Sequence, residues 1–357
     1  MVGVAGAAAG AATGSPILAI DLGATRLRAA LVGSDGAVLA RAEELSATDR
    51  GPAALLDLAE RLIRAVSRTT ERNPGDALVS PGALPAAPVA IGISAIGPVD
   101  PVAGVILDPP NAPALRDVPI APELERRLGL PAFLDRDTNV ALLGEHAFGA
   151  ARGVADVVYL TVSTGIGGAV LAGGALFHGP DGTAGELGHL LVELDGPPCG
   201  CGARGHLEAI ASGAGIARAA REAVRAGGGG LLAAAADRDG IERLSAVDVA
   251  AAEEAGDAAA AAIMEHARRA FAAALVVIAD VFDPTLVVVG GSVARGQGDR
   301  LLDPAREAVR SAAFRAPGRR LSIVPAALGD DVCLVGCLPL VRERLAVTAA
   351  VRAETRA

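Results

Sequence analysis

The chain has 357 residues, a length that suits two domains or one large one. Hydrophobic residues make up 52% of it and aromatic residues only 2%, so the core must be built from Ala, Val, Leu and Ile, as in an Ala-rich globular enzyme. The net charge of −9, without a basic cluster, argues against nucleic acid and anionic membranes as partners. Four cysteines in a chain of this length do not indicate a disulfide scaffold.

The N-terminal segment 1–15 is rich in Ala and Gly and lacks the basic region of a signal peptide, so we expect a flexible tail. The apolar run before residue 282 is interrupted by Asp280, and no transmembrane helix is evident. The cytoplasm is therefore the expected location.

In the first part of the chain, residues 17–20 and 28–32 read as buried strands, and a turn at 34–36 leads into a third strand. The 3.6-residue spacing of apolar side chains predicts a helix over 52–68. A Pro- and Gly-rich loop at 73–88 precedes a strand at 89–93. A Pro-rich connection over 97–122 then leads to a short helix near 122–128.

In the second part, a strand is followed by a helix that begins near Asp137 or Thr138. Residues 157–177 repeat the pattern of 17–40, which suggests two related halves. Helices are expected at 207–225, 255–281, 299–312 and 332–346, with a strand before Gly290. Cys333 and Cys337 have helical spacing in an apolar stretch and are predicted core residues. Alternating strands and helices predict an α/β fold with two lobes.

Three glycine-containing turns follow buried strands. The first is "DLGAT", with Asp21, Gly23 and Thr25; the second is "STGIGGA", with Thr164 and Gly165; the third contains Gly290 and Gly291. Such turns bring backbone N–H groups close to phosphate, and a carboxylate at a strand end can hold the water shell of Mg²⁺. None of them matches the P-loop or dinucleotide fingerprint. Together they predict a nucleotide site between two lobes, although each alone could be a simple turn.

A cluster of metal-ligand residue types lies between positions 189 and 206. It contains two of the five histidines, His189 and His206, and two of the four cysteines, Cys199 and Cys201. Two thiolates and two imidazoles satisfy a structural zinc ion, and a Pro- and Gly-rich loop without a core gains order from a metal. The alternative is a chance pair of loop cysteines with two surface histidines.

These motifs together resemble the ROK family of sugar kinases and sugar-responsive repressors, which belongs to the actin-like, ribonuclease-H-like ATPase superfamily. The resemblance runs from Pro16 to about Ala346. It rests on "IDLGATRLRAALV", "GISAIGPVD", "TVSTGIGGAV", "GTAGELGH", "CGCGARGHLEAIAS" and "VVVGGSV", in that order. It implies two ribonuclease-H-like domains with an interdomain cleft that closes on ATP and a hexose. We place a smaller domain at 16–135, completed by the helix 332–350, and a larger one with the zinc loop at 136–331.

The resemblance also implies roles for individual residues. Asp137 matches the catalytic base, and His189 serves both the sugar and zinc. Sugar contacts fall on Asn111, Arg136, Glu186, His189 and Glu208. The phosphate and adenosine segments fall on Asp21, Gly23, Thr25, Thr164, Gly165, Gly290 and Gly291, and the structural zinc on His189, Cys199, Cys201 and His206. ATP, Mg²⁺ and Zn²⁺ are the implied cofactors, and a homo-oligomer, dimer or tetramer, is the implied assembly.

Four departures from the family pattern bear on function. Arg136 replaces the Asn that precedes the catalytic Asp; because Arg accepts no hydrogen bond, either it turns away and Asn139 helps, or the sugar pocket has changed. His206 replaces a third Cys, a change that zinc tolerates. Ile96 replaces a Pro, and Ala24 a Gly.

Three functions remain open at this point. The leading one is ATP-dependent phosphorylation of a hexose, with glucose first, and with N-acetylmannosamine or fructose as alternative acceptors and polyphosphate as an alternative donor. A sugar-binding protein with weak or no catalysis is second, because of Arg136. A repressor is third, because we expect no room for a DNA-reading helix in the segment before Ile17.

Overall fold

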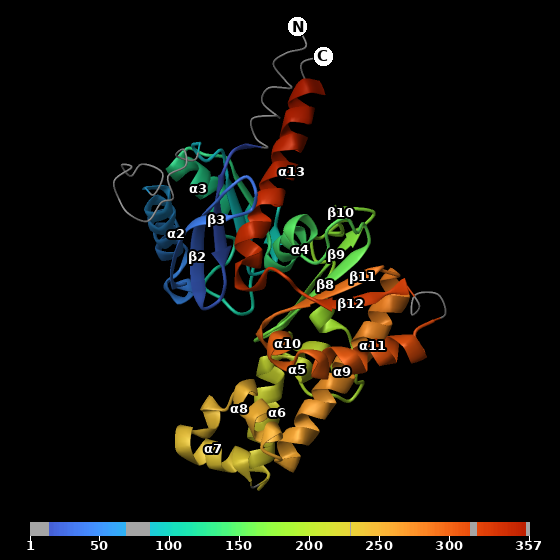
Figure 1. The fold of residues 1–357 in the computed structure, drawn as a ribbon. Helices are drawn as coiled ribbons and strands as arrows, with labels where there is room; N and C mark the ends of the chain where they lie inside the picture. The colour runs from blue at the N-terminus through green and yellow to red at the C-terminus, as the bar shows by residue number, and fades with distance from the viewer. Residues whose placement is uncertain (1–13, 69–85, 229, 315–319, 355–357) are drawn as a thin grey trace. The chain divides into compact units, whose positions relative to one another are not determined.

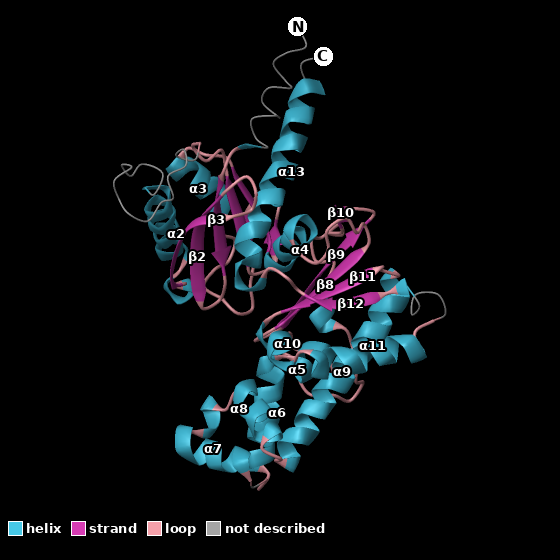
Figure 2. Cartoon of the chain, in the orientation of Figure 1, coloured by secondary structure: helices cyan, strands magenta, loops and turns pink. Residues whose placement is uncertain are grey.

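The computed structural model describes residues 14–68, 86–228, 230–314 and 320–354 (Figure 1). Contacts divide the chain into two units. The first holds the residues up to Arg152, Pro180–Gly182 and those from Asp330 onward; the second holds Gly153–Gly179 and Thr183–Gly329. Helices and strands occur in both units, which confirms the predicted α/β fold (Figure 2). The predicted tail lies almost wholly outside the described residues.

The first unit is built on a five-stranded sheet in the order β3-β2-β1-β4-β7. The strands are β1 (Ile17–Leu22), β2 (Arg26–Val32), β3 (Val38–Leu45), β4 (Ile91–Ala95) and β7 (Ala132–Arg136). The first three form an antiparallel meander, and β4 and β7 continue it in parallel. β1 and β4 are buried at every position, as expected of central strands.

Helices and short segments complete this unit. They are η1 (Thr48–Arg50), α2 (Pro52–Ser67), the strand pair β5 (Val99–Asp100) and β6 (Val105–Ile106), α3 (Ile120–Leu128), α4 (Asp137–Phe148) and α13 (Val332–Glu354). The predicted helix 52–68 is therefore confirmed, and its apolar stripe is the buried face of α2. The loop predicted at 73–88 falls mostly outside the described residues.

The first unit extends to Arg152, beyond the boundary that we placed after residue 135. The physical reason is the packing of α4 along α13. A Cβ placed on Gly336 of α13 would lie 1.9 Å from the carbonyl oxygen of Val140 in α4, so the two helix backbones are in direct contact. α4 therefore belongs to the unit that contains α13.

The second unit repeats the strand order of the first in its own sheet, β10-β9-β8-β11-β12. The strands are β8 (Val157–Val162), β9 (Ile166–Ala172), β10 (Ala175–Leu176), β11 (Leu286–Gly290) and β12 (Ser322–Pro325). β8, β9 and β10 form the antiparallel meander, and β11 and β12 are parallel. The repeat predicted from the sequence is thus present as a repeated topology.

The rest of the second unit is helical. It contains η3 (Leu187–His189), α5 (Leu207–Ala211), α6 (Gly213–Arg225), α7 (Leu231–Asp239), η4 (Ile241–Arg243), α8 (Ala246–Glu254), α9 (Ala258–Phe282), α10 (Ser292–Gln297) and α11 (Asp299–Ala312). η5 (Gly329–Asp331) lies where the chain returns to the first unit. The single helix predicted at 207–225 is in fact two, because buried Ser212 caps α6 by accepting the N–H of Gly215 at 3.0 Å.

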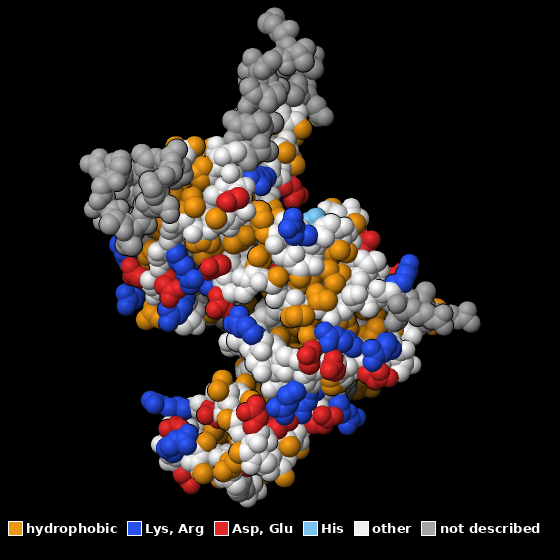
Figure 3. All heavy atoms as spheres, viewed as in Figure 1, with side chains coloured by type: hydrophobic (Ala, Val, Ile, Leu, Met, Phe, Trp, Pro, Cys, Tyr) orange, Lys and Arg blue, Asp and Glu red, His pale blue; other side chains and the backbone are white. Residues whose placement is uncertain are grey.

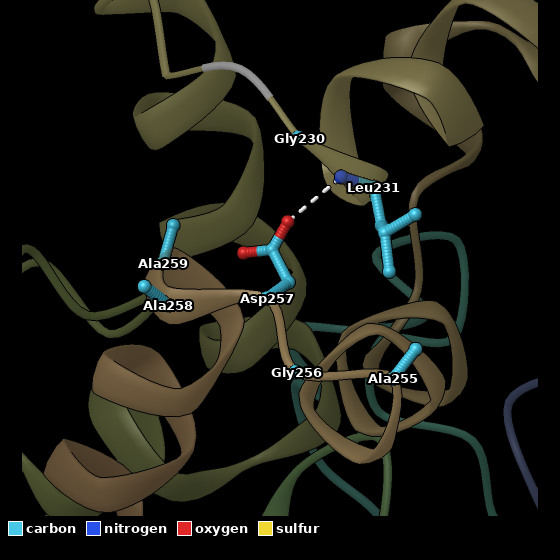
Figure 4. Close-up of a pocket in the computed structure, with 7 residues that line it drawn as sticks. All are labelled: Gly230, Leu231, Ala255, Gly256, Asp257, Ala258 and Ala259. Atoms are coloured by element: carbon cyan, nitrogen blue, oxygen red, sulfur yellow. Dashed lines mark hydrogen bonds between the residues drawn. The ribbon is translucent and has the colours of Figure 1, made fainter.

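One carboxylate joins two helices of this unit. Asp257 caps α9 by accepting the N–H of Ala260 at 2.9 Å. Its other oxygen accepts the N–H of Leu231, at the first turn of α7, at 2.8 Å (Figure 4). Two helix N-termini thus share one negative charge, an arrangement that their dipoles favour.

Charged side chains of opposite sign lie together on the surface. On the face shown in Figure 3, basic and acidic groups are mixed rather than collected into one basic patch. In the second unit, Arg306 pairs with Asp303 at 2.7 Å and Arg300 with Glu254 at 3.5 Å. Among the described residues, none of the helices combines the length and the apolar character that a membrane-crossing segment requires.

Candidate active site

Asp21, on β1, is the centre of a buried polar cluster in the first unit. Its side chain is almost fully buried and forms an ion pair with Arg28 at 2.7 Å. Its second oxygen accepts the hydroxyl of Ser94 at 3.0 Å. Burial raises the pKa of the Asp21 carboxyl, and Arg28, Ser94 and the thiol of Cys333 act in the opposite direction. The cluster therefore holds the Asp21 side chain in one orientation, at the end of β1 that leads into the first glycine turn.

The first turn, Gly23–Thr25, follows β1 directly. The N–H of Gly23 is donated to Arg26 O at 2.9 Å, which closes the turn. The hydroxyl of buried Ser46 is donated to Ala24 O at 2.6 Å. Ala24 is not among the non-glycine residues with positive φ. Alanine therefore suits a position where the family has glycine.

Asp137 begins α4, where the last residue of β7 passes into the helix. Its Oδ1 accepts the N–H of Thr138 at 2.7 Å, and its side chain is half-buried. A carboxylate at a helix N-terminus is stabilised as an anion by the helix dipole. The position therefore suits a group that must accept a proton from a substrate hydroxyl.

Arg136 is the last residue of β7 and is buried, with 5% of its surface exposed. Its guanidinium lies 3.5 Å from Asn139 Oδ1, and its side chain packs against Gly97. The Asn139 amide donates to Asp135 at 2.7 Å and is itself buried. Asn139 is thus occupied by Asp135 and Arg136, which disfavours the substitute role that we considered for it.

Asn111 completes the candidate residues of this unit, and Cys333 lies close to one of them, Asp137. Asn111 is exposed in the turn between β6 and α3. Cys333, a predicted core residue, is only half-buried, and its sulphur lies 3.6 Å from Asp137 O. Burial and the carboxylates of Asp21 and Asp137 raise the pKa of its thiol well above the usual value, so it remains a protonated donor. Cys337 is fully buried, as predicted.

The second and third glycine turns lie side by side in the second unit. Ser163, Thr164 and Gly165 connect β8 to β9. Gly290 ends β11, and Gly291 connects it to α10. The hydroxyls of Ser163 and Ser292 are 3.0 Å apart and bridge the two turns. The strand pairing of β8 with β11 brings these turns to one sheet edge.

The predicted metal ligands converge in the same unit. His189, Cys199, Cys201 and His206 each present one donor atom, and these atoms all lie within 4.8 Å of one another. The Nδ1 atoms of the two histidines are 3.3 Å apart. Cys199 Sγ lies 3.7 Å from His189 Nδ1, and Cys201 Sγ lies 3.3 Å from His206 Nδ1.

These separations fit a tetrahedral zinc ion. Zinc bonds of about 2.0–2.1 Å to nitrogen and about 2.3 Å to sulphur imply edges of about 3.4 Å between nitrogens and about 3.6 Å between nitrogen and sulphur. Burial raises the pKa of the Cys199 thiol, and a bound cation would favour its thiolate. The loop folds back on itself through bridges between Leu191 and His206 and between Pro198 and Arg204.

Glu186 and Glu208 flank the cluster. Glu186 is exposed and precedes η3, and its carbonyl accepts the N–H of His189 at 3.1 Å. Glu208 lies in the first turn of α5, and its Oε2 accepts the N–H of Ile166, at the start of β9, at 2.8 Å. Glu208 therefore touches the second glycine turn, a contact that the sequence did not predict.

The candidate residues are thus distributed over both units. The first unit contains Asp21, Gly23, Thr25, Asn111, Arg136 and Asp137, and the second contains Thr164, Gly165, Glu186, His189, Cys199, Cys201, His206, Glu208, Gly290 and Gly291. Sequence reasoning missed Ser94 and Arg28, which hold Asp21, and the hydroxyls of Ser163 and Ser292. Arg28 is a charged residue within an apolar strand, which could have marked it as the partner of a buried acid.

The chain belongs to the ROK family, whose family model matches residues 17–344. It is 34% identical over 330 residues to a glucokinase of Thermotoga maritima, which covers 92% of this chain and 98% of that protein. It is 37% identical to an N-acetylmannosamine kinase of Shigella flexneri, over 79% of this chain and 84% of that protein.

A solved structure extends this similarity to the fold. A ROK family glucokinase from Streptomyces griseus, in complex with glucose and AMPPNP, has a TM-score of 0.74 and 30% sequence identity to this chain. The comparison covers 92% of this chain and all of that one. The resemblance inferred from the sequence motifs is confirmed.

Proposed function

We propose that this protein transfers the terminal phosphoryl group of ATP to a hydroxyl of a hexose, with glucose as the principal acceptor and glucose 6-phosphate as the product. The observation that carries the proposal is the 34% identity to a glucokinase across nearly the whole of both chains. The site residues of both units support it, since each predicted residue type stands at a turn, strand end or helix start suited to its role.

Asp137 acts as the general base in this proposal. A sugar hydroxyl has a high pKa, so a positioned carboxylate must accept its proton as the new phosphate ester bond forms. Such a base contributes roughly 10²–10⁴-fold to the rate. The remaining acceleration comes from positioning and from donors that neutralise the phosphoryl charge.

Asp21 would hold the magnesium ion that accompanies ATP, through water rather than directly. A carboxylate accepts about four hydrogen bonds, and Asp21 already accepts from Arg28 and Ser94. Room therefore remains for metal-bound water. Magnesium keeps several waters in most sites, which agrees with this limited capacity. The turns at Gly23–Thr25, Thr164–Gly165 and Gly290–Gly291 would supply backbone donors to the phosphates.

A zinc ion bound by His189, Cys199, Cys201 and His206 would order the metal loop. Both histidines present Nδ1 to the cluster, which leaves Nε2 of His189 for a sugar hydroxyl. Glu186, Glu208 and Asn111 would provide further sugar contacts, because each hydroxyl of a bound hexose that is left unpaired costs about 1–3 kcal/mol. We also infer a cytoplasmic location. We infer in addition that the protein forms a homo-oligomer, and sedimentation velocity tests this assembly.

N-acetylmannosamine is the second candidate acceptor. The 37% identity to an N-acetylmannosamine kinase favours it. Arg136 argues against plain glucose specificity, because its side chain accepts no hydrogen bond from a sugar hydroxyl. A protein that binds sugar without turning it over would share these features.

A panel of acceptors tests the proposal. Purified protein with ATP and Mg²⁺ is given glucose, N-acetylmannosamine, fructose, mannose or glucosamine, and ADP release is followed. We expect the highest kcat/KM with glucose. Asp137→Asn should lower kcat by about 10²–10⁴-fold and leave sugar affinity intact, while Asp108→Asn, at an exposed ion pair with Arg116, should change neither. If none of the five sugars causes ADP release, kinase function is contradicted. An active Asp137→Asn variant would exclude Asp137 as the base.

A further inference from the structure

The turn between β8 and β9 is held by the chain segment that follows the metal loop. The carbonyl oxygens of Ser163 and Thr164 accept the N–H groups of Gly213 at 2.8 Å and Ala214 at 3.0 Å. The N–H of Ile166 is donated to Oε2 of Glu208 at 2.8 Å. Three peptide groups of this turn thus depend on residues 208–214, which begin two positions after the metal-ligand residue His206.

The other histidine of the cluster is linked to the same residue of the turn. Gly188 immediately precedes His189, and a Cβ placed on it would lie 1.9 Å from Ile166 O. A Cβ placed on Gly165 would lie 2.6 Å from Glu208 Oε2. Because no side chain fits at either glycine, Ile166 is in direct contact with both the segment around His189 and the segment around His206.

The geometry of the cluster therefore bears on the turn. The Nδ1 atoms of His189 and His206 lie 3.3 Å apart, so a cation that binds both fixes η3 relative to the start of α5. Gly188 in η3 and Glu208 in α5 both contact Ile166. Loss of the cation would allow η3 and α5 to separate. The contacts that Gly188 makes with Ile166 O and that Glu208 makes with Ile166 N–H would then loosen.

We propose that the His/Cys cluster, acting through Glu208, sets the conformation of the turn Ser163–Ile166, so that Glu208 is a positioning residue for the nucleotide. The inference rests on the proposed function, which assigns this turn to the phosphates of ATP. It adds that the metal loop and the nucleotide turn are energetically coupled: ligands that order one should tighten binding at the other, by the same factor in both directions.

Two measurements on Glu208 variants test the coupling. The first is amide hydrogen exchange of peptides that cover residues 163–168, without nucleotide or sugar. The second is the Kd of a non-hydrolysable ATP analogue without sugar. In Glu208→Ala the N–H of Ile166 loses its acceptor, so we expect its exchange to be faster and the Kd to rise about tenfold. Glu208→Gln keeps an acceptor without the charge and should show a smaller rise.

Glu193→Gln is the matched control. Glu193 lies in the same loop, and its carboxylate is exposed and pairs with His266 at 3.0 Å rather than with the turn. This variant should leave both measurements unchanged. Wild-type protein stripped of metal by a chelator should show the same faster exchange at Ile166 as Glu208→Ala.

The metal content of each variant is measured alongside, so that loss of the loop is not mistaken for loss of the contact. If Glu208→Ala fails to fold, the isosteric Glu208→Gln provides the test. Unchanged exchange at Ile166 in a metal-bound Glu208→Ala protein would overturn the coupling, even if that protein phosphorylates a hexose. Faster exchange in the variant would support the coupling even if the acceptor panel shows no kinase activity, which separates the two failures.

Discussion

At the scale of single residues, Arg136 is the residue whose proposed role bears most directly on substrate choice. It precedes the proposed base directly and is buried between Gly97 and Asn139. The family has Asn at this position, which both donates and accepts hydrogen bonds, whereas a guanidinium only donates. A sugar hydroxyl can donate a hydrogen bond to an Asn side chain but cannot donate one to Arg136.

Replacement of Arg136 by Asn should therefore improve glucose as a substrate. The added acceptor contributes about 1 kcal/mol, which corresponds to a rise in kcat/KM of roughly fivefold to tenfold. Steady-state kinetics with glucose and N-acetylmannosamine at saturating ATP measure the change, and Arg116→Asn, at an exposed arginine, is the control. If kcat/KM falls for one sugar while the protein stays folded, Arg136 itself contacts that sugar.

At the scale of elements, the link between α7 and α9 depends on one carboxylate. Removal of an N-cap costs about 1–2 kcal/mol, and Asp257 serves the first turns of two helices. Asp257→Ala should therefore lower the free energy of unfolding by about 2 kcal/mol or more in urea titrations at neutral pH. Asp257→Asn should lose less, because its amide oxygen still accepts a hydrogen bond. Asp239→Asn, at an exposed ion pair, should be near neutral.

The same carboxylate predicts a dependence on pH. The N–H of Ala260, and then those of Leu231 and its neighbours, lower the pKa of Asp257 in the folded state. A folded-state pKa below the unfolded value of about 3.9 means that the stabilisation is complete above that value and is lost as the pH falls through the folded pKa. The gap in stability between wild type and Asp257→Asn should therefore narrow in acid. A gap that is constant down to pH values below the folded pKa would contradict this.

The sequence predicts elements well where periodicity is strong and local. The helix 52–68 is found within one residue of its predicted end, and the strand pair at 17–32 is found with its turn. β12 was missed because its four residues become a strand only by pairing with β11. α7 and α8 were missed because a Gly-rich segment at 227–230 and short, weakly amphipathic runs give no clear period.

The same distinction applies to the site. The spacing of Cys199, Cys201 and His206 was enough to predict a metal cluster, because the ligands lie close in sequence. The contacts of Asp21 with Ser94 and of Glu208 with Ile166 join residues far apart in sequence, so only the fold shows them. Helical spacing placed Cys333 and Cys337 on one face but could not tell that Cys333 would lie beside Asp137 O.

At the scale of the whole molecule, two units with the same strand order each have a core of their own. One core collects side chains of β1, β2, β4, α2 and α3, and the other collects side chains of β8, β9, β11, α6 and α9. All four predicted metal ligands belong to the second unit, whereas Asp21 and Asp137 belong to the first. Metal binding should therefore stabilise one core and not the other.

Calorimetry of the whole chain with and without metal tests this division. Structural zinc binds zinc-finger peptides with about 10–16 kcal/mol, and a domain of this size shifts its Tm by about 2–4 °C per kcal/mol. We therefore expect two transitions, one of which falls by about 20 °C or more in a chelator while the other stays in place. Cys201→Ala, which lacks one ligand, should show the lowered transition from the start and no further change with chelator. A single transition that shifts as a whole would mean that the two cores unfold together, and a chelator without effect in wild type would mean that the cluster holds no stabilising metal.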